Sequence, residues 1–139
     1  MYFLLFRISF ADTCSTPIPK DLYATRLTDI EKSIQARDVE QVKSNIDKAR
    51  FLLPCVVQPL DPSMVQRYFI TQGLYYFLEK DKDKTQLYFS SAKAIGLNDP
   101  ILHSIYPKGH VIHQVYSDAP SLDDVQVMEK PSIGKIYFD

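Results

Sequence analysis

Apolar side chains recur at spacings of three and four along residues 21–96, and turn-forming segments interrupt the pattern at three places. This spacing puts side chains on one face of an α-helix, so it favours a mainly α fold. It predicts four helices, at about 21–35, 38–53, 62–79 and 83–95. Their expected inner residues are Leu22, Tyr23, Leu27, Ile30, Ile34, Val39, Val42, Ile46, Ala49, Leu53, Val65, Phe69, Gln72, Gly73, Tyr76, Phe77, Leu87, Tyr88, Ala92 and Ile95.

The predicted helix ends carry capping signals. Asp38 precedes the second helix, and Gln41 follows three residues later, which is the spacing of a reciprocal N-cap. Pro54 ends the second helix and begins a connector at 55–63 that contains two further prolines. Gly96 follows the fourth helix, where a left-handed backbone conformation commonly ends a helix.

The charge balance narrows the possible functions. The chain has 139 residues, with 16 Lys and Arg against 17 Asp and Glu. It therefore lacks a broad phosphate-neutralising surface, and we do not expect nucleic acid as a partner. The 4 Gly and 2 Cys are too few for a glycine-rich phosphate site or a four-thiolate zinc site. Charged side chains are expected on outer helix faces, as in a pair between Asp47 and Arg50.

Residues 2–11 form an apolar run of the length found in signal peptides, and it is too short to span a membrane. Small side chains at Ser9 and Ala11 suit a signal peptidase, which would remove residues 1–11. Arg7 lies inside the run and no basic residue precedes it, so packing of this run on the domain is the alternative. We predict export to the periplasm or cell envelope, with a cytoplasmic location as the second interpretation.

Cys14 and Cys55 are the only cysteines, and in an exported chain they can pair. Cys14 lies in an extended Ser/Thr/Pro-rich stretch, while Cys55 follows the end of the second helix. A disulfide between them would tie the N-terminal tail to the helices and add about 3–4 kcal/mol in the chain-entropy treatment. Two free thiols, with Cys55 buried, are the alternative.

Large and small side chains follow one another on the third and fourth helices in the order expected of two interlocking helices. These residues are Phe69, Gly73, Tyr76, Phe89 and Ala92. The segment 69–92 that contains them resembles a tetratricopeptide repeat, a pair of antiparallel helices that meet at small residues. Thr85 stands where that family usually has alanine at the closest helix crossing.

Residues 27–54 are similar to a more degenerate copy of the same repeat. The matching residues are Val42, Ile46, Ala49 and Pro54. Ile30 replaces the small residue of the first helix, so the packing of this pair is expected to differ. The resemblance implies two stacked antiparallel hairpins, a fragment of an α-solenoid.

The C-terminal third changes character. Residues 101–105 are expected to be a short helix, and 110–116 a second short helix or an apolar strap. Val125 and Val127 alternate with polar residues and residues 135–138 are β-prone, so residues 125–139 are expected to form a partly β arm. We therefore divide the chain into an N-terminal segment (1–20), a four-helix domain (21–100) and a strap with an arm (101–139).

Two groups of side chains are candidates for binding another protein. Aromatic residues surround most of the third helix and continue onto the fourth, so they are either buried on several sides or face a partner. Filling the core of a domain without Trp is the alternative. The candidates from this group are Tyr68, Tyr75 and Tyr88. The second group lies at the end of the arm, where Ile136, Tyr137 and Phe138 could add a strand to a partner's sheet. A loosely packed arm is the alternative.

Catalytic patterns are sparse. His110 and His113 lie three residues apart, with Asp118 and Asp124 nearby, but no established zinc-binding spacing accompanies them. Capping or surface histidines are the simpler interpretation, and we predict no catalytic residues, metal or cofactor.

The expected function is therefore protein binding, as a scaffold or assembly subunit of an envelope-associated complex. A self-associating subunit whose tails exchange between copies is the first alternative. A metal-dependent enzyme that uses the region of His110 and His113 is the second.

Overall fold

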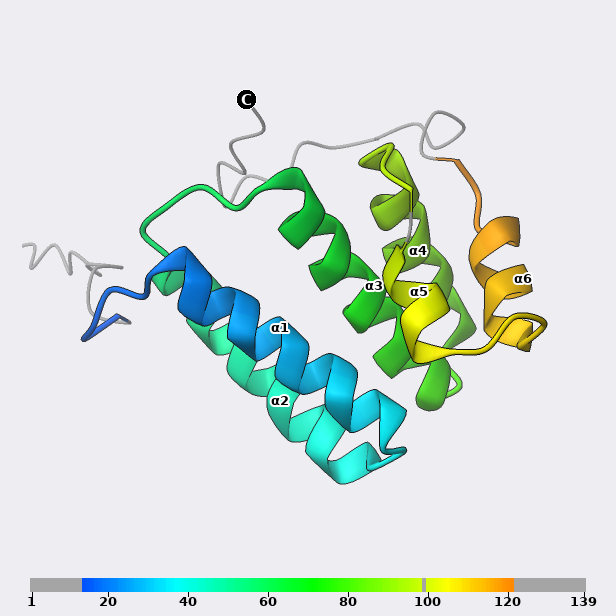
Figure 1. Cartoon of the computed structure of the whole chain (residues 1–139), viewed down its shortest axis with the longest axis horizontal. Coiled ribbons are helices and arrows are strands. Elements are labelled where there is room, and N and C mark those ends of the chain that lie inside the picture. Colours follow the sequence, from blue (N-terminus) through cyan, green and yellow to red (C-terminus); the bar gives the residue numbers. More distant parts are fainter. Residues whose placement is uncertain (1–13, 99, 122–139) are drawn as a thin grey trace, which may run out of the picture.

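The computed structural model describes residues 14–98 and 100–121. The helices of this part are α1 (Lys20–Gln35), α2 (Val39–Leu52), the 3-10 turn η2 (Leu53–Cys55), α3 (Pro62–Leu78), α4 (Lys82–Ala94), α5 (Pro100–Ile105) and α6 (Val111–Asp118). The prediction of a mainly α fold is confirmed for the described residues (Figure 1). The apolar run at 2–11 and the β-prone residues 125–139, with Ile136, Tyr137 and Phe138, lie outside them.

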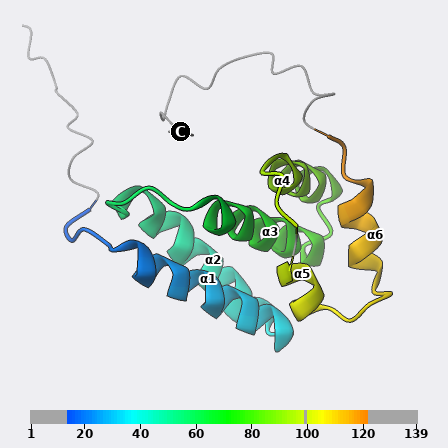
Figure 2. The same ribbon diagram turned by 45° about the horizontal axis from the view of Figure 1, so that its top comes forward.

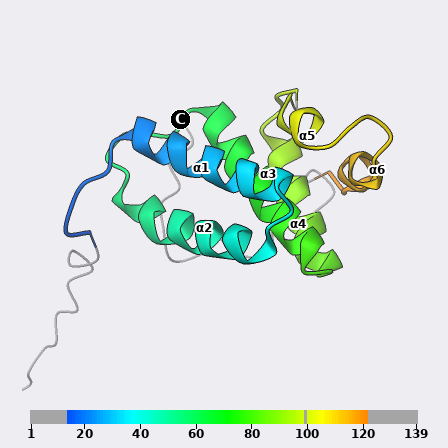
Figure 3. The same ribbon diagram turned by 60° about the horizontal axis from the view of Figure 1, so that its bottom comes forward.

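The first four helices form two pairs. α1 packs against α2, and α3 packs against α4; short turns make the partners of each pair antiparallel (Figure 1). α3 also contacts both α1 and α2, so the two pairs share one core. In the view of Figure 3, α1 lies above α2.

Of the twenty predicted inner residues, ten are buried, seven are half-buried and three are exposed. Leu22, Val39 and Leu87 are 42%, 43% and 58% exposed. The buried side of α4 instead follows Thr85, Phe89 and the later Ala92. Positions 87 and 89 point about 200° apart on a helix, so an inner face centred on position 89 directs Leu87 to solvent.

Close contact between α3 and α4 occurs at Gly73. A Cβ atom at this position would overlap the ring of Phe89, which is completely buried. The Phe89 ring thus occupies the space that a side chain at position 73 would need. Large and small residues interlock here in the order that the sequence suggested.

The last two described helices belong to the same core. Leu102 of α5 and Ile112 of α6 are buried in one hydrophobic cluster with the residues of α1–α4. α5 contacts α1, and α6 contacts α4 (Figure 2). The core of the described residues therefore continues beyond residue 100 through these two short helices.

Two of the predicted helix ends are confirmed, and one detail is not. The Asp38 carboxylate accepts the Gln41 N–H at 3.0 Å, and Gly96 has a φ of 76°. The Gln41 side chain does not accept the Asp38 N–H in return; its amide instead donates to the Asn45 side chain at 3.1 Å.

The segment before α1 is fastened to the turn after α2. Cys14 and Cys55 form a disulfide in the structure. Ile18 pairs with Val56 as an isolated parallel bridge, with an N–H to carbonyl distance of 2.9 Å from Ile18 to Cys55. Lys20 and Asp61 add an ion pair of 3.1 Å. Within residues 14–98 and 100–121, no helix has both the length and the apolar character needed to cross a membrane.

Candidate functional site

Arg50 extends from α2 toward α3. Its Nε donates to Oε1 of Gln72 at 2.7 Å, and its Nη2 donates to the Tyr76 hydroxyl at 2.9 Å. The guanidinium carbon lies 5.7 Å from the ring centroid of Tyr75 and 5.4 Å from that of Tyr76. The predicted pairing with Asp47 is therefore wrong, because hydrogen bonds to α3 direct Arg50 inward.

The sequence did contain a signal for this position. Arg50 follows Ile46 by four residues and Ala49 by one, so its stem lies at the edge of the buried stripe. A long side chain at such an edge can reach across to the neighbouring helix while its alkyl stem packs on apolar groups.

Aromatic rings continue the surface from Arg50 across α3 to α4. Tyr76 stacks on Tyr88 with centroids 5.4 Å apart, and Phe69 lies 6.4 Å from Tyr88 and 5.7 Å from Tyr68. Tyr75 lies 5.1 Å from Tyr76. We call this group the Arg50–tyrosine surface; its members are Arg50, Tyr68, Phe69, Tyr75, Tyr76 and Tyr88.

The three tyrosines that the sequence suggested for partner binding differ in burial. Tyr68 and Tyr88 are half-buried, with part of each ring accessible. Tyr75 is only 8% exposed. Its predicted role as a surface contact is wrong, because little of its ring is accessible; the ring lies against Tyr76 and the Arg50 guanidinium.

Arg50 supplies a positive charge to this surface, and no counter-ion is found for it among the described residues. Among the described residues, no carboxylate lies within ion-pairing distance of Arg50. Burial raises the pKa of the Tyr68 phenol, and the neighbouring Tyr88 raises it further, while Arg50 acts in the opposite direction. The Tyr68 hydroxyl therefore stays neutral at physiological pH and can donate a hydrogen bond.

The histidines have local roles in the structure. His110 caps α6, since its Nδ1 accepts the Ile112 N–H at 3.2 Å. Nε2 of His113 lies 3.0 Å from the carbonyl of Pro107, and its ring stacks on His103 at 4.7 Å. In residues 14–98 and 100–121, no group of three or more His, Cys, Asp or Glu is arranged to hold a metal ion. Asp124 lies outside these ranges.

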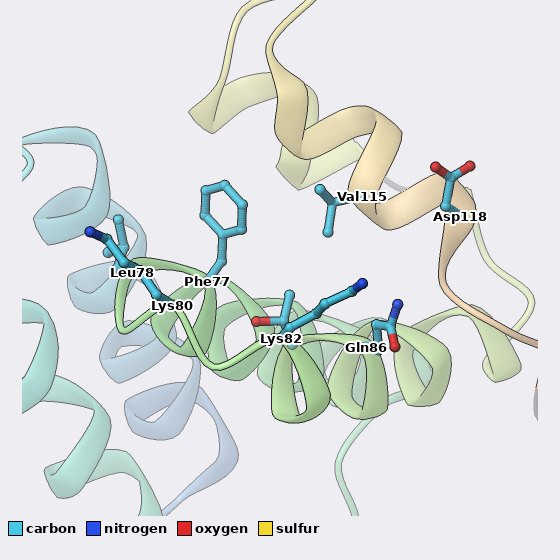
Figure 4. A pocket seen from close by; sticks show the side chains of 8 residues that line it. Phe77, Leu78, Lys80, Lys82, Gln86, Val115 and Asp118 are labelled. Atoms are coloured by element: carbon cyan, nitrogen blue, oxygen red, sulfur yellow. The ribbon is translucent and has the colours of Figure 1, made fainter.

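A cavity of about 670 Å³ opens where the end of α3, the start of α4 and one side of α6 meet (Figure 4). Its lining combines apolar and polar side chains, namely Phe77, Leu78, Lys80, Lys82, Thr85, Gln86, Val115 and Asp118. We call it the α3–α4–α6 cavity. No local sequence pattern indicates this cavity, because its walls come from residues up to 41 positions apart.

No protein-family profile, curated protein or solved structure matches the chain.

Proposed function

We propose that this protein is a non-enzymatic protein-interaction subunit that binds its partner through the Arg50–tyrosine surface. The single observation behind this proposal is Arg50, held by two hydrogen bonds over tyrosine rings and without a carboxylate partner among the described residues. A cation fixed in this way presents its remaining N–H groups to an incoming acceptor at little cost in side-chain entropy.

The composition of the surface supports protein binding over catalysis. Arginine and tyrosine are enriched at the energetic centres of protein interfaces, because they combine large contact area with hydrogen-bonding groups. Half-buried rings such as Tyr68 and Tyr88 lose little freedom when a partner covers them. Gln72 and Tyr76 hold Arg50 in place, so the surface is organised before a partner arrives.

We further propose that the pairs α1/α2 and α3/α4 are tetratricopeptide-like hairpins stacked as an α-solenoid fragment. The overlap that a side chain at Gly73 would make with Phe89 supports this for the second pair. Buried Val42, Ile46 and Ala49 support it for the first pair. Stacked hairpins present extended surfaces that suit other protein chains.

The proposed location is the periplasm or cell envelope, and the proposed role is a scaffold or assembly subunit of a complex there. The Cys14–Cys55 disulfide supports an oxidising compartment, because such bonds persist outside the reducing cytosol. The residues Ile136, Tyr137 and Phe138 remain our candidates for a second contact, through strand addition to the partner.

Co-purification from the native host tests the proposal. Full-length tagged chains carrying Arg50→Gln or Tyr88→Leu are compared with wild type and with Arg37→Gln, an exposed arginine in the turn between α1 and α2. We expect an unlike chain to co-purify with wild type and with Arg37→Gln, and to be reduced about tenfold with the other two. Circular dichroism checks that each variant is folded.

Equal recovery of the partner with all four proteins would show that this surface is not the binding site. Recovery of copies of this chain alone, in large assemblies, would favour the self-associating subunit with exchanged tails.

A further inference from the structure

The guanidinium of Arg50 has hydrogen-bonding capacity beyond its bonds to α3. A guanidinium carries five N–H groups, and the bonds to Gln72 and Tyr76 use two of them, at 2.7 and 2.9 Å. Arg50 is half-buried, so part of its side chain is accessible to another molecule. Because a guanidinium donates hydrogen bonds and accepts none, its remaining N–H groups suit a ligand that supplies acceptor oxygens.

The charge at this position corresponds to a single positive charge. Lys84 lies next to the Arg50–tyrosine surface, with its ammonium 4.9 Å from the ring centroid of Tyr76. Asp81 balances this lysine, because its carboxylate lies 3.3 Å from the ammonium and accepts the Lys84 backbone N–H at 3.0 Å. Arg50 has no such partner among the described residues. One uncompensated charge suits a carboxylate, which carries one negative charge, better than a phosphate group, which carries nearly two.

Apolar groups border the cation on α4. Positions 84, 87 and 88 share one face of a helix, so Leu87, which is 58% exposed, extends the surface beside the half-buried ring of Tyr88. Phe69, whose ring centroid lies 6.4 Å from that of Tyr88, is also half-buried. A partner with apolar side chains next to its charge would remove these groups from water, whereas an isolated charge would not. The surface therefore suits a segment in which apolar residues flank one acidic residue.

We propose that the partner carries an Asp or Glu side chain, flanked by apolar residues, whose carboxylate binds the Arg50 guanidinium. The apolar flanks pack on Leu87 and on the ring of Tyr88. This inference rests on the proposed function, because it names the chemistry of the partner at the same surface.

Zero-length cross-linking tests this contact. A water-soluble carbodiimide joins an amine directly to a carboxylate that touches it, and it leaves a guanidinium unchanged. Arg50→Lys therefore places a reactive amine at the site and keeps the positive charge. Full-length tagged Arg50→Lys is treated in an extract of the native host and compared with wild type, Arg50→Gln and Arg37→Lys. The last of these makes the same exchange at an exposed position in the turn between α1 and α2. Circular dichroism checks that each variant is folded.

We expect mass spectrometry to find residue 50 of the Arg50→Lys chain joined to an Asp or Glu side chain of one unlike protein. Residue 37 of the Arg37→Lys chain should form no such bond. Arg50→Lys should retain about a third of the partner recovered with wild type, since it keeps the charge and loses the planar N–H geometry, whereas Arg50→Gln should retain about a tenth.

A synthetic peptide that spans the joined residue of the partner completes the test. Replacement of its acidic residue by the corresponding amide should weaken binding to wild type about tenfold, and binding to Arg50→Gln less than about twofold, because the second chain has already lost the charge contact.

Several results would overturn this inference and leave the proposed function intact. One is a partner that binds the Arg50→Lys chain while residue 50 is joined to none of its Asp or Glu side chains, or only to its terminal carboxylate. Another is an equal loss of the partner with Arg50→Lys and Arg50→Gln, because charge then plays no part. A third is co-purification that phosphatase treatment abolishes, which would assign the acceptor to a phosphate group. Equal recovery of the partner with all four proteins would instead remove the proposed function itself.

Discussion

Replacement of Gly73 by alanine tests the close packing of α3 on α4. The new methyl group would overlap the ring of Phe89. That ring cannot easily withdraw, since it is fully buried and makes an edge contact with Tyr116 at a centroid distance of 5.3 Å. Movement of Phe89 therefore requires movement of α6, or an opening of the angle between α3 and α4.

Two opposing effects set the size of the change. Overpacking of a filled core costs typically about 1–3 kcal/mol. Alanine in place of glycine inside a helix returns up to about 1 kcal/mol, because the unfolded chain loses conformational freedom. We expect Gly73→Ala to lower the free energy of unfolding by about 1–2 kcal/mol, which corresponds to a fall in Tm of about 3–8 °C for a domain of this size.

Urea and thermal unfolding of the full chain measure this effect. Ser44→Ala, at an exposed position of α2, is the control and should change stability by less than about 0.5 kcal/mol. A double-mutant cycle with Phe89→Leu should show that the two changes are not additive, with a coupling of about 1 kcal/mol, because the smaller side chain makes room for the methyl group. A Gly73→Ala protein as stable as wild type would refute the reasoning.

Three further predictions concern stability. Reduction of the bridge between Cys14 and Cys55, which are 41 residues apart, should lower the unfolding free energy by about 4 kcal/mol; an unchanged urea midpoint after reduction would show that the bridge does not constrain the chain. Burial raises the pKa of Tyr23 well above its ordinary value, so above about pH 10 the folded chain keeps a proton that the unfolded chain releases, and stability falls as pH rises. Tyr23→Phe should lower the free energy of unfolding by about 1 kcal/mol at neutral pH, because its hydrogen bond to α2 is lost. In denaturation experiments at a series of pH values, the free energy of unfolding of this variant should fall less steeply above about pH 10 than that of wild type. An identical slope would contradict this. Glu31→Gln should cost about 1–2 kcal/mol by urea unfolding, because Glu31 receives two bonds from Arg67 of α3, at 2.9 and 3.1 Å, and a loss below about 0.3 kcal/mol would contradict it.

Local signals predicted the helices well. The N-cap at Asp38 and the left-handed Gly96 both depend on a few neighbouring residues, so the sequence contains the information for them. The order of Gly73 and Phe89 likewise indicated a close helix contact, which the structure has. In each case one residue type has a conformational or steric property that few others share.

Properties that depend on the rotation of a helix in the folded chain were predicted less well. Leu87 is exposed and Tyr75 is buried because neighbouring helices determine which side of α3 or α4 is covered. The inward turn of Arg50 depends on Gln72 and Tyr76, more than 20 residues away. Such contacts arise from tertiary packing, and the spacing of apolar residues alone cannot indicate them.

The sequence predicted a short helix at 101–105 and a second short helix or a strap at 110–116, but it did not show how either one packs. Both helices are short, with 6 and 8 residues, so neither has enough turns for a clear apolar period. Leu102 and Ile112 nevertheless belong to the core cluster, and α5 contacts α1 while α6 contacts α4.

Cross-linking mass spectrometry on the full chain in its native host tests the central claim most directly. The ammonium of Lys84 lies 4.9 Å from the ring of Tyr76, so this lysine reports on the Arg50–tyrosine surface. Lys108, exposed in the turn between α5 and α6, is the internal control. We predict cross-links from Lys84 to one unlike protein chain, in excess of those from Lys108 and lost with Arg50→Gln. Cross-links from Lys84 that reach only this chain or copies of it would contradict the account.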